Sequence, residues 1–268
     1  MKYKYKKINK CPQCNSKDYT LWDNNKNNEI KAFQCSNCSL VYMNKILTDE
    51  DLIDFYNCYN ETRDNENIEN KTKRNLMYEL DYNSISSIVE SGNFLDIGCG
   101  QGDFLNYFNN VKKIGYDIDQ SATAIGSNVY DDIDFISSLD CVDDDTINCV
   151  LFRGTLQYMR DINKTIQYTY DKLKNNGYLC VLSLPNTDSP LAIVQKENWV
   201  MCNKIEHIQL FNYNSLEFLL RDKFKIIRVD YPYLQTPYEN NKTDLQSFIN
   251  IIKNIEGAET KHFPFWGS

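Results

Sequence analysis

The sequence predicts an α/β protein with a mostly parallel, doubly wound sheet, preceded by a small module held together by cysteines. Three observations support this fold class. Strand-like apolar runs alternate with helical periodicities between residues 94 and 184, as expected for parallel strands joined by crossover helices. The first of these strands runs into three glycines, Gly98, Gly100 and Gly102. Near the N-terminus, two C-x-x-C pairs stand 20 residues apart, a spacing that one metal ion can close.

The composition argues against several classes of protein. The chain is 42% hydrophobic over 268 residues with only six prolines, so a folded core is expected rather than disorder. No run of about 18 apolar residues occurs, so neither a membrane span nor a signal peptide is predicted, and a cytoplasmic protein is expected. The net charge of -8 offers no general attraction for phosphate backbones, so nucleic acid is not the expected partner.

The paired cysteines predict a zinc ribbon over residues 1–47, with short strands at 19–22 and 30–33 between the pairs. The predicted ligands are Cys11, Cys14, Cys35 and Cys38. A closed four-thiolate site leaves no open coordination position, so the ion should be structural. The alternatives are a redox dithiol or unligated core cysteines, but a thioredoxin-type motif would show one C-x-x-C opening a helix.

Two helices are predicted between the ribbon and the sheet, forming a linking or lid segment over 48–92. The first, 48–59, begins at a Thr cap followed by three acidic residues. The second, about 71–91, carries apolar residues at helical spacing and ends before Gly92. The remaining residues, 93–268, form the predicted main domain.

The main domain should contain most of the regular structure. Its predicted strands cover 94–98, 112–117, 133–137, 147–153, 178–184 and 224–229. Its predicted helices cover 102–109, 120–127, 161–174, 214–221 and 244–255. Residues 262–268 are too short and proline-broken to predict a further edge strand. Ligands of an open parallel sheet bind beyond the carboxyl ends of the strands, so the loops after residues 98, 117, 137 and 153 should border one crevice.

The glycines after the first strand would let a ligand lie against the backbone. Asp96 lies inside that strand, and Asp117 ends the next one. Together these residues resemble motif I of class I S-adenosylmethionine (SAM) methyltransferases. A dinucleotide fold would instead require glycine at position 103, where Asp103 stands and would repel a pyrophosphate. SAM carries no phosphate, so this objection does not apply to it.

The resemblance implies a Rossmann-like methyltransferase domain with SAM as cofactor. It implies that Asp117 accepts both ribose hydroxyls, because the two oxygens of a carboxylate match a diol. Ser138 and Leu139 would border the adenine, and Arg63 or Tyr78 of the lid segment would lie over SAM, where an arginine can hold the methionine carboxylate. The complete set of expected cofactor contacts is Asp96, Gly98, Cys99, Gly100, Gly102, Asp117, Ile118, Ser138, Leu139, Arg153, Gly154, Arg63 and Tyr78.

Two later segments resemble methyltransferases that act on small molecules. Gln157 and Tyr158 stand where a Leu-Glu-His-like turn has its Glu and His, so this turn is expected to line the pocket without acting as a base. His207 lies in a Glu-His-x-x-x-Phe stretch that faces the acceptor in such enzymes. We therefore take His207 as the candidate general base, with a purely structural histidine as the alternative.

The resemblance implies SAM-dependent methyl transfer, with O-methylation favoured, to a small polar acceptor. A zinc ribbon followed by a methyltransferase domain is similar to bacterial sugar and surface-glycan methyltransferases, so the expected acceptor is a sugar or sugar-linked group of capsule or surface-polysaccharide synthesis. One alternative is a ribosomal RNA base methyltransferase with an N-terminal zinc module, which the net charge of -8 disfavours. The other is a non-catalytic zinc module that holds SAM.

Overall fold

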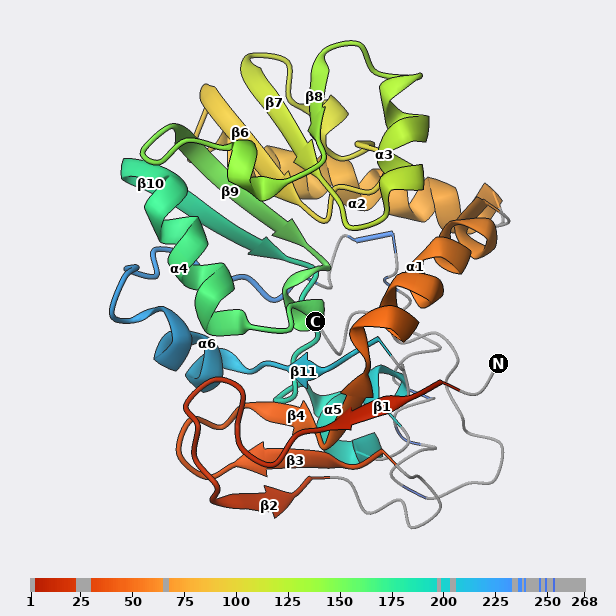
Figure 1. Ribbon diagram of the computed structural model, residues 1–268, viewed down its shortest axis with the longest axis vertical. Helices are drawn as coiled ribbons and strands as arrows, with labels where there is room; N and C mark the ends of the chain where they lie inside the picture. The colour runs from red at the N-terminus through yellow and green to blue at the C-terminus, as the bar shows by residue number, and fades with distance from the viewer. Residues whose placement is uncertain are drawn as a thin grey trace. The chain divides into compact units, whose positions relative to one another are not determined.

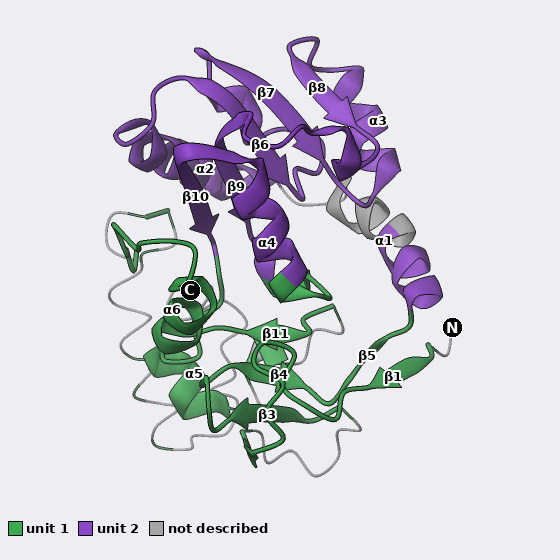
Figure 2. Cartoon of the chain, turned by 60° about the vertical axis from the view of Figure 1, so that its left-hand side comes forward, with its two compact units in different colours: residues 1–48, 157–163, 184–268 green, residues 49–156, 164–183 purple. Residues whose placement is uncertain are grey.

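The computed structural model divides the chain into two compact units, each described here by itself (Figures 1 and 2). The described residues are 3–22, 30–64, 68–196, 199–202, 206–232, 236, 237, 239, 246, 249 and 253, without the side chains of 57–64 and 200. Unit 1 comprises residues 1–48, 157–163 and 184–268, and unit 2 comprises residues 49–156 and 164–183. None of the helices among the described residues is both long and apolar enough to cross a membrane.

Unit 2 is built on a five-stranded parallel sheet. Its strands are β6 (Gly92–Ile97), β7 (Val111–Tyr116), β8 (Ile133–Ile136), β9 (Ile147–Arg153) and β10 (Leu173–Leu182). They lie in the order β10-β9-β6-β7-β8, and all neighbours are parallel. The chain starts in the middle at β6, moves outward through β7 and β8, and then crosses back to place β9 on the other side of β6. This confirms the predicted Rossmann-like class and puts the topological switch point between β6 and β9.

Helices lie on both faces of this sheet. Those between Asp49 and Lys172 are α1 (Asp49–Asp64), α2 (Ile68–Ser86), α3 (Gln120–Ser127) and α4 (Ile162–Lys172). In Figure 1, α2 runs behind the sheet and α4 in front of it, while α3 lies beside β8. Tyr78 and Ile85 of α2 share one buried cluster with Phe94, Cys149 and Leu151, which point to the same face of β6 and β9. α2 therefore has an apolar side that is buried on the sheet.

Some helix boundaries follow from capping. α3 begins where predicted because the Asp119 carboxylate accepts hydrogen bonds from the backbone N–H groups of Ser121 and Ala122. α6 (Tyr213–Leu220) begins with a capping box, in which the side chains of Asn212 and Ser215 each accept from the other's backbone N–H.

Two predicted elements differ in the structure. Over 102–109 only a 3-10 turn forms, η1 (Leu105–Tyr107), because Gly102 has φ +88° and Phe108 is extended, with φ -90° and ψ 113°. Residues 224–229 form no strand, and the side chains of Ile227 and Val229 are 62% and 46% exposed. Their alternation of apolar residues is therefore not matched by a buried face. Most of the predicted helix 244–255, and residues 262–268, lie outside the described residues.

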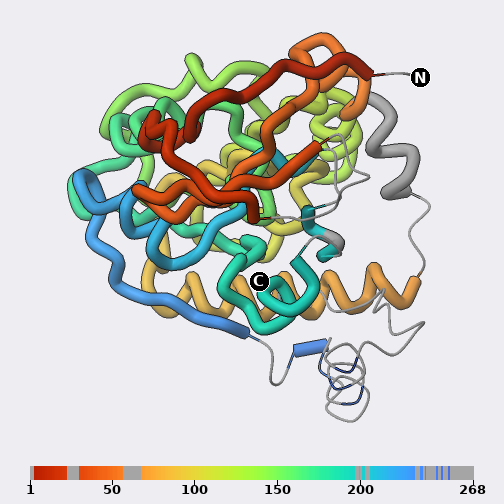
Figure 3. Tube along the Cα trace, turned by 90° about the horizontal axis from the view of Figure 1, so that it is seen from below, coloured from red at the N-terminus to blue at the C-terminus, as the bar shows by residue number. Residues whose placement is uncertain are grey.

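Unit 1 joins the N-terminal ribbon to segments that follow β10. Its four-stranded antiparallel sheet contains β2 (Tyr19–Leu21), β3 (Ala32–Cys35), β4 (Val41–Met43) and β11 (Gln209–Leu210). The strand order is β11-β4-β3-β2, and β1 (Tyr5–Lys7) pairs separately with β5 (Lys45–Leu47). Figure 3 shows the red and orange N-terminal strands beside the blue-green stretch that includes β11. The ribbon is thus completed by residues more than 160 positions away in the sequence.

The core of unit 1 lies on one side of this sheet. Its buried members come from β3, β4, β11, the helix α5 (Pro190–Gln195), the turn η5 (Val200–Cys202) and the residue that precedes η5. They are Ala32, Val41, Met43, Leu191, Ala192, Trp199, Cys202 and Leu210. Trp199 is fully buried and is the largest side chain of this core.

Candidate cofactor site, metal site and proton acceptor

The glycine-rich loop after β6 is held against the end of β7. The backbone N–H groups of Gly98 and Cys99 both donate to the Tyr116 carbonyl, at 2.7 and 3.1 Å. Gly98 has φ +88°, and a Cβ there would lie 2.6 Å from Thr155 Oγ1 and even closer to its Cγ2. The loops after β6 and β9 therefore meet at the switch point with no side chain between them, which requires glycine at position 98.

Asp117 is tied to this loop by its carboxylate. Its Oδ2 accepts from the Gly100 N–H at 2.8 Å, and its Oδ1 accepts from the Asp119 N–H at 2.9 Å. The structure thus brings together two of the residues that the sequence assigns to the cofactor. A carboxylate offers about four acceptor positions, so these loop contacts are compatible with a ribose diol on the same group.

Arg153, at the end of β9, is held by the lid helix α2. Its Nε donates to Asp81 Oδ2 at 2.8 Å, and both side chains are largely buried. Its guanidinium lies 4.3 Å from the ring centroid of Tyr78 and 5.3 Å from that of Phe104. Burial raises the pKa of Asp81, and the adjacent Arg153 partly offsets this effect. Sequence reasoning missed Asp81, because no motif marks a single acid within a charged helix.

Asp96 is a buried carboxylate whose Oδ1 has no hydrogen-bond partner among the described residues. Its side chain is 2% exposed. Burial raises its pKa to about 7, the charge of Arg153 opposes that shift, and Asp117 adds to it. An unpartnered carboxylate near a guanidinium matches the ammonium and carboxylate of an amino acid. The residues present therefore fit the methionine end of SAM.

Three other expected cofactor contacts follow the carboxyl ends of β7 and β8: Ile118, Ser138 and Leu139. Ser138 caps the turn η2 (Leu139–Cys141), accepting from the Asp140 N–H at 3.2 Å. The carbonyl of Leu139 accepts from Tyr168 Oη at 2.8 Å. Ile118 is 49% exposed. These residues stay predictions as cofactor contacts.

Four further expected contacts are also untested. Gly102 and Gly154 both have positive φ angles, +88° and +67°. The Cys99 side chain is buried and points toward Gly115 of β7. The side chain of Arg63, in α1, lies outside the described residues.

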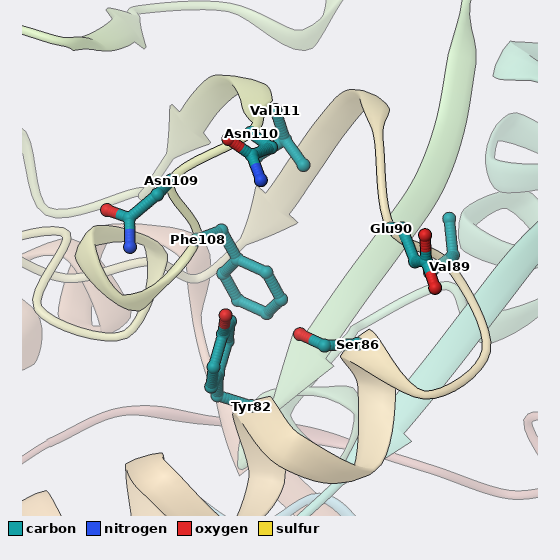
Figure 4. Close-up of a pocket in the computed structure, with 8 residues that line it drawn as sticks. All are labelled: Tyr82, Ser86, Val89, Glu90, Phe108, Asn109, Asn110 and Val111. Atoms are coloured by element: carbon teal, nitrogen blue, oxygen red, sulfur yellow. The ribbon is translucent and has the colours of Figure 1, made fainter.

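A hollow of about 180 Å³ opens at the opposite, amino ends of β6 and β7 (Figure 4). Figure 4 shows the Phe108 ring between Tyr82 and Ser86 of α2, with Glu90 further along the same wall. Ligands of open parallel sheets bind at the carboxyl ends of the strands. We therefore do not assign the cofactor to this hollow.

The four predicted zinc ligands converge in unit 1. The Sγ atoms of Cys11 and Cys38 are 3.5 Å apart, those of Cys14 and Cys35 are 3.4 Å apart, and all four lie within 4.8 Å of one another. Tetrahedral zinc with Zn–S bonds of about 2.3 Å separates its sulfurs by roughly 3.8 Å. The cluster is therefore of the right size for one ion.

The two knuckles have the same backbone construction. In the first, Cys11 N–H donates to the Ser16 carbonyl and Asn15 N–H to the Cys11 carbonyl, both at 2.9 Å. In the second, the equivalent bonds join Cys35 to Leu40 at 2.9 Å and Ser39 to Cys35 at 3.0 Å. Asn15 and Ser39, each following a second cysteine, have φ of 60° and 62°. This repeated geometry turns both cysteines of each pair toward one point, which unligated core cysteines would not require.

His207 is buried, 2% exposed, and both of its ring nitrogens are engaged. Nδ1 lies 2.7 Å from the Met201 carbonyl and Nε2 lies 3.2 Å from Tyr158 Oη. A carbonyl can only accept, so Nδ1 carries the proton, and in the neutral ring Nε2 accepts from the Tyr158 hydroxyl. The Tyr158 ring also stacks on the imidazole, with centroids 5.2 Å apart. Sequence reasoning gave Tyr158 no proton-transfer role, because its contact with His207 spans 49 residues.

Comparison with known proteins gives the same fold. A family model described as a methyltransferase domain matches residues 64–223, whereas no curated protein sequence matches the chain. Among solved structures, a chain from the complex between the Trm112 methyltransferase activator of Haloferax volcanii and a methyltransferase has a TM-score of 0.53 at 14% identity, with 74% of this chain and 84% of that chain covered.

Two further structures show a weaker likeness. A SAM-dependent methyltransferase of Thermotoga maritima, titled a possible histamine N-methyltransferase, has a TM-score of 0.47 at 18% identity, with 57% of this chain and 72% of that chain covered. The YcgJ protein of Bacillus subtilis has a TM-score of 0.47 at 15% identity, with 67% and 84% covered.

Proposed function

The chain belongs to the methyltransferase-domain family and is a SAM-dependent methyltransferase; from this premise we propose that its acceptor is a hydroxyl of a sugar or sugar-linked group in bacterial surface-polysaccharide synthesis. The observation that carries the proposal is the Tyr158–His207 pair. Phosphate and carboxylate acceptors are already anionic, whereas a neutral hydroxyl must lose a proton near the transition state. A histidine fixed with an unprotonated Nε2 facing a hydroxyl is suited to that task.

The cofactor residues belong to unit 2. We propose that Asp117 holds the ribose diol, that the loop Gly98–Gly102 lies under the nucleoside, and that Arg153 and Asp96 hold the carboxylate and ammonium of the methionine end. Support comes from the hydrogen bond that the Gly100 N–H donates to Asp117. It also comes from Asp96 Oδ1, which has no hydrogen-bond partner among the described residues. Ile118, Ser138, Leu139, Gly154, Tyr78 and Arg63 stay in the proposed cofactor set.

The proton path is carried by two residues of unit 1. We propose that the Tyr158 oxygen takes the proton of the acceptor hydroxyl as its own proton passes to His207 Nε2, leaving an imidazolium held by the Met201 carbonyl. Bound at the proposed cofactor residues, SAM would supply the methyl group for the new C–O bond, and the sulfur would keep the electron pair of the broken C–S bond and leave as S-adenosylhomocysteine. The protein contributes orientation and a fixed proton acceptor.

We propose that the ion at Cys11, Cys14, Cys35 and Cys38 is zinc and that it is structural. Four thiolates complete a tetrahedral shell and leave no position for substrate. The prediction is about one zinc per chain by elemental analysis, and a protein purified without metal in which the strands of the ribbon are still folded would contradict it.

The function can be tested by measuring S-adenosylhomocysteine formation from SAM with a panel of nucleotide sugars, against an RNA transcript and a no-acceptor control. Turnover with a nucleotide sugar that is lost in His207→Gln supports the proposal. Salt-sensitive turnover on RNA would instead support the nucleic-acid alternative. Tight binding of S-adenosylhomocysteine without turnover on any acceptor would favour the non-catalytic alternative.

A further inference from the structure

We propose that the four-cysteine metal site, besides closing its own knuckles, positions the Tyr158–His207 pair. The inference rests on the proposed function only where it gives that pair a role in proton transfer. The cysteines, Tyr158 and His207 all belong to unit 1, and two chains of printed contacts connect them.

The first connection runs across the antiparallel sheet. Cys35 ends β3, which pairs with β4, and β4 pairs with β11. Beyond the last paired residue, the Met43 N–H donates to the carbonyl of Ile208 at 3.0 Å. Ile208 directly follows His207, so two strand pairings join a metal ligand to the backbone beside the imidazole.

The same short strand also fixes the backbone on both sides of Tyr158. The Ile208 N–H donates to the Gln157 carbonyl at 3.4 Å, and Gln209 Nε2 donates to the Met159 carbonyl at 2.8 Å. Tyr158 stands between these two acceptors. Since β11 is only two residues long, its position depends on β4, and the tyrosine depends on β11.

The second connection starts at the first knuckle. Asn163 Nδ2 donates to the carbonyls of Pro12 and Gln13, at 3.2 and 2.9 Å, and Gln13 Nε2 donates to the Ser215 carbonyl at 2.9 Å. Pro12 and Gln13 are the two residues between the first pair of ligands, so the knuckle presents these groups only when it is formed. Asn163 follows Tyr158 by five residues, at the start of α4.

The ribbon strands are too short to hold this arrangement alone. β2, β3 and β4 have three or four residues each, and in small modules of this kind metal binding supplies much of the folding free energy. Removing the metal should therefore release β3 and β4, and with them β11. The glycine loop and Asp117 belong to the separate sheet of unit 2, so cofactor affinity should persist.

The test uses the full chain and nitrogen-15 spectra of its histidine rings. The chain has only two histidines, and His262→Gln assigns the signals. At pH 8 the zinc-loaded protein should show His207 as the single Nδ1–H tautomer. Chelation should convert it to a mixture of tautomers, zinc should restore it, and calorimetry on the same samples should find S-adenosylhomocysteine affinity unchanged within about twofold.

Two outcomes would overturn the inference. A His207 tautomer that survives chelation would show that the metal does not position the pair. Loss of S-adenosylhomocysteine binding together with the tautomer would show that the metal supports the whole chain instead. Neither readout measures methyl transfer. A protein without methyltransferase activity would therefore contradict the proposed function and leave the inference about the metal site unaffected.

A variant that keeps all four cysteines tests the intermediate step. Gln209→Ala removes the side-chain hydrogen bond to Met159 and should leave one metal per chain. Amide exchange at Tyr158 and Met159 should become about fivefold faster, as expected for the loss of one buried hydrogen bond, while exchange across β3 and β4 stays constant. Unchanged exchange at Tyr158 would contradict the coupling through β11.

Discussion

The close approach of two loops at the switch point predicts that Gly98→Ala is far more harmful than a matched change at Gly154. Both glycines have positive φ, +88° and +67°, and an L-residue in the left-handed region costs about 1–2 kcal/mol. A Cβ at Gly154 would have its nearest neighbours, atoms of Ser183, at 3.9 Å, so only that backbone cost applies. A Cβ at Gly98 would also overlap the Thr155 side chain, and overpacking adds typically 1–3 kcal/mol.

The expected free-energy losses are therefore about 1–2 kcal/mol for Gly154→Ala and about 2–5 kcal/mol for Gly98→Ala. Scanning calorimetry can measure both losses. The relevant unfolding transition is the one whose midpoint S-adenosylhomocysteine raises, and this midpoint should fall by about 4 °C per kcal/mol for a unit of this size. Combining Gly98→Ala with Thr155→Gly should return a coupling energy of about 1–3 kcal/mol in a double-mutant cycle. Equal losses at the two glycines, or no coupling to Thr155, would refute the argument from close approach.

Three further predictions follow from the polar groups of the two units. Asp117→Ala should weaken S-adenosylhomocysteine binding at least about tenfold, because hydrogen bonds to a charged acceptor are lost, while exposed Asp131→Ala should not; equal affinities by calorimetry would remove Asp117 from the ribose role. Because burial raises the pKa of Asp96 to about 7, the stability that it contributes should be full below about pH 4 and be lost as the pH rises through 7; Asp96→Asn should flatten this part of the stability profile, and an unchanged profile would argue against it. Tyr158→Phe and His207→Gln should each lower kcat by about 10²–10⁴ with cofactor affinity unchanged, and a normal kcat in both variants would leave His207 structural.

The fold was predictable where an element depends on residues that are close to one another in the sequence. Strand β9 and helix α3 begin and end at the predicted residues, because each is set by a local apolar pattern or by a cap such as Asp119. The knuckles were predictable for the same reason, since each ligand pair lies within one turn. The helix expected over 102–109 was wrong because the backbone leaves the helical region at both ends, with φ +88° at Gly102 and an extended Phe108.

Contacts between distant segments left no signal in the sequence. β11 has two residues and pairs with a ribbon strand encoded far earlier, so no local pattern marks it as a strand. Likewise, Asp81 meets Arg153 across 72 residues, and Tyr158 meets His207 across 49. The residues of the candidate site that were predicted singly therefore acquire partners only in the folded chain, and these partners decide their protonation and orientation.

The charges of unit 2 suggest how the protein can distinguish the methyl donor from its product. Asp81 and Arg153 form an ion pair through their 2.8 Å contact, and Asp96 and Asp117 are two further acidic groups near the glycine loop. SAM carries one more positive charge than S-adenosylhomocysteine, and a pair of unit charges about 10 Å apart at an effective dielectric constant of about 20 is worth roughly 1.7 kcal/mol, or more than tenfold in affinity. Asp96→Asn removes one of these acidic groups, so at pH 8 it should lower the preference for SAM over its product. An unchanged ratio of the two dissociation constants in Asp96→Asn would show that the sulfonium charge is not felt at Asp96.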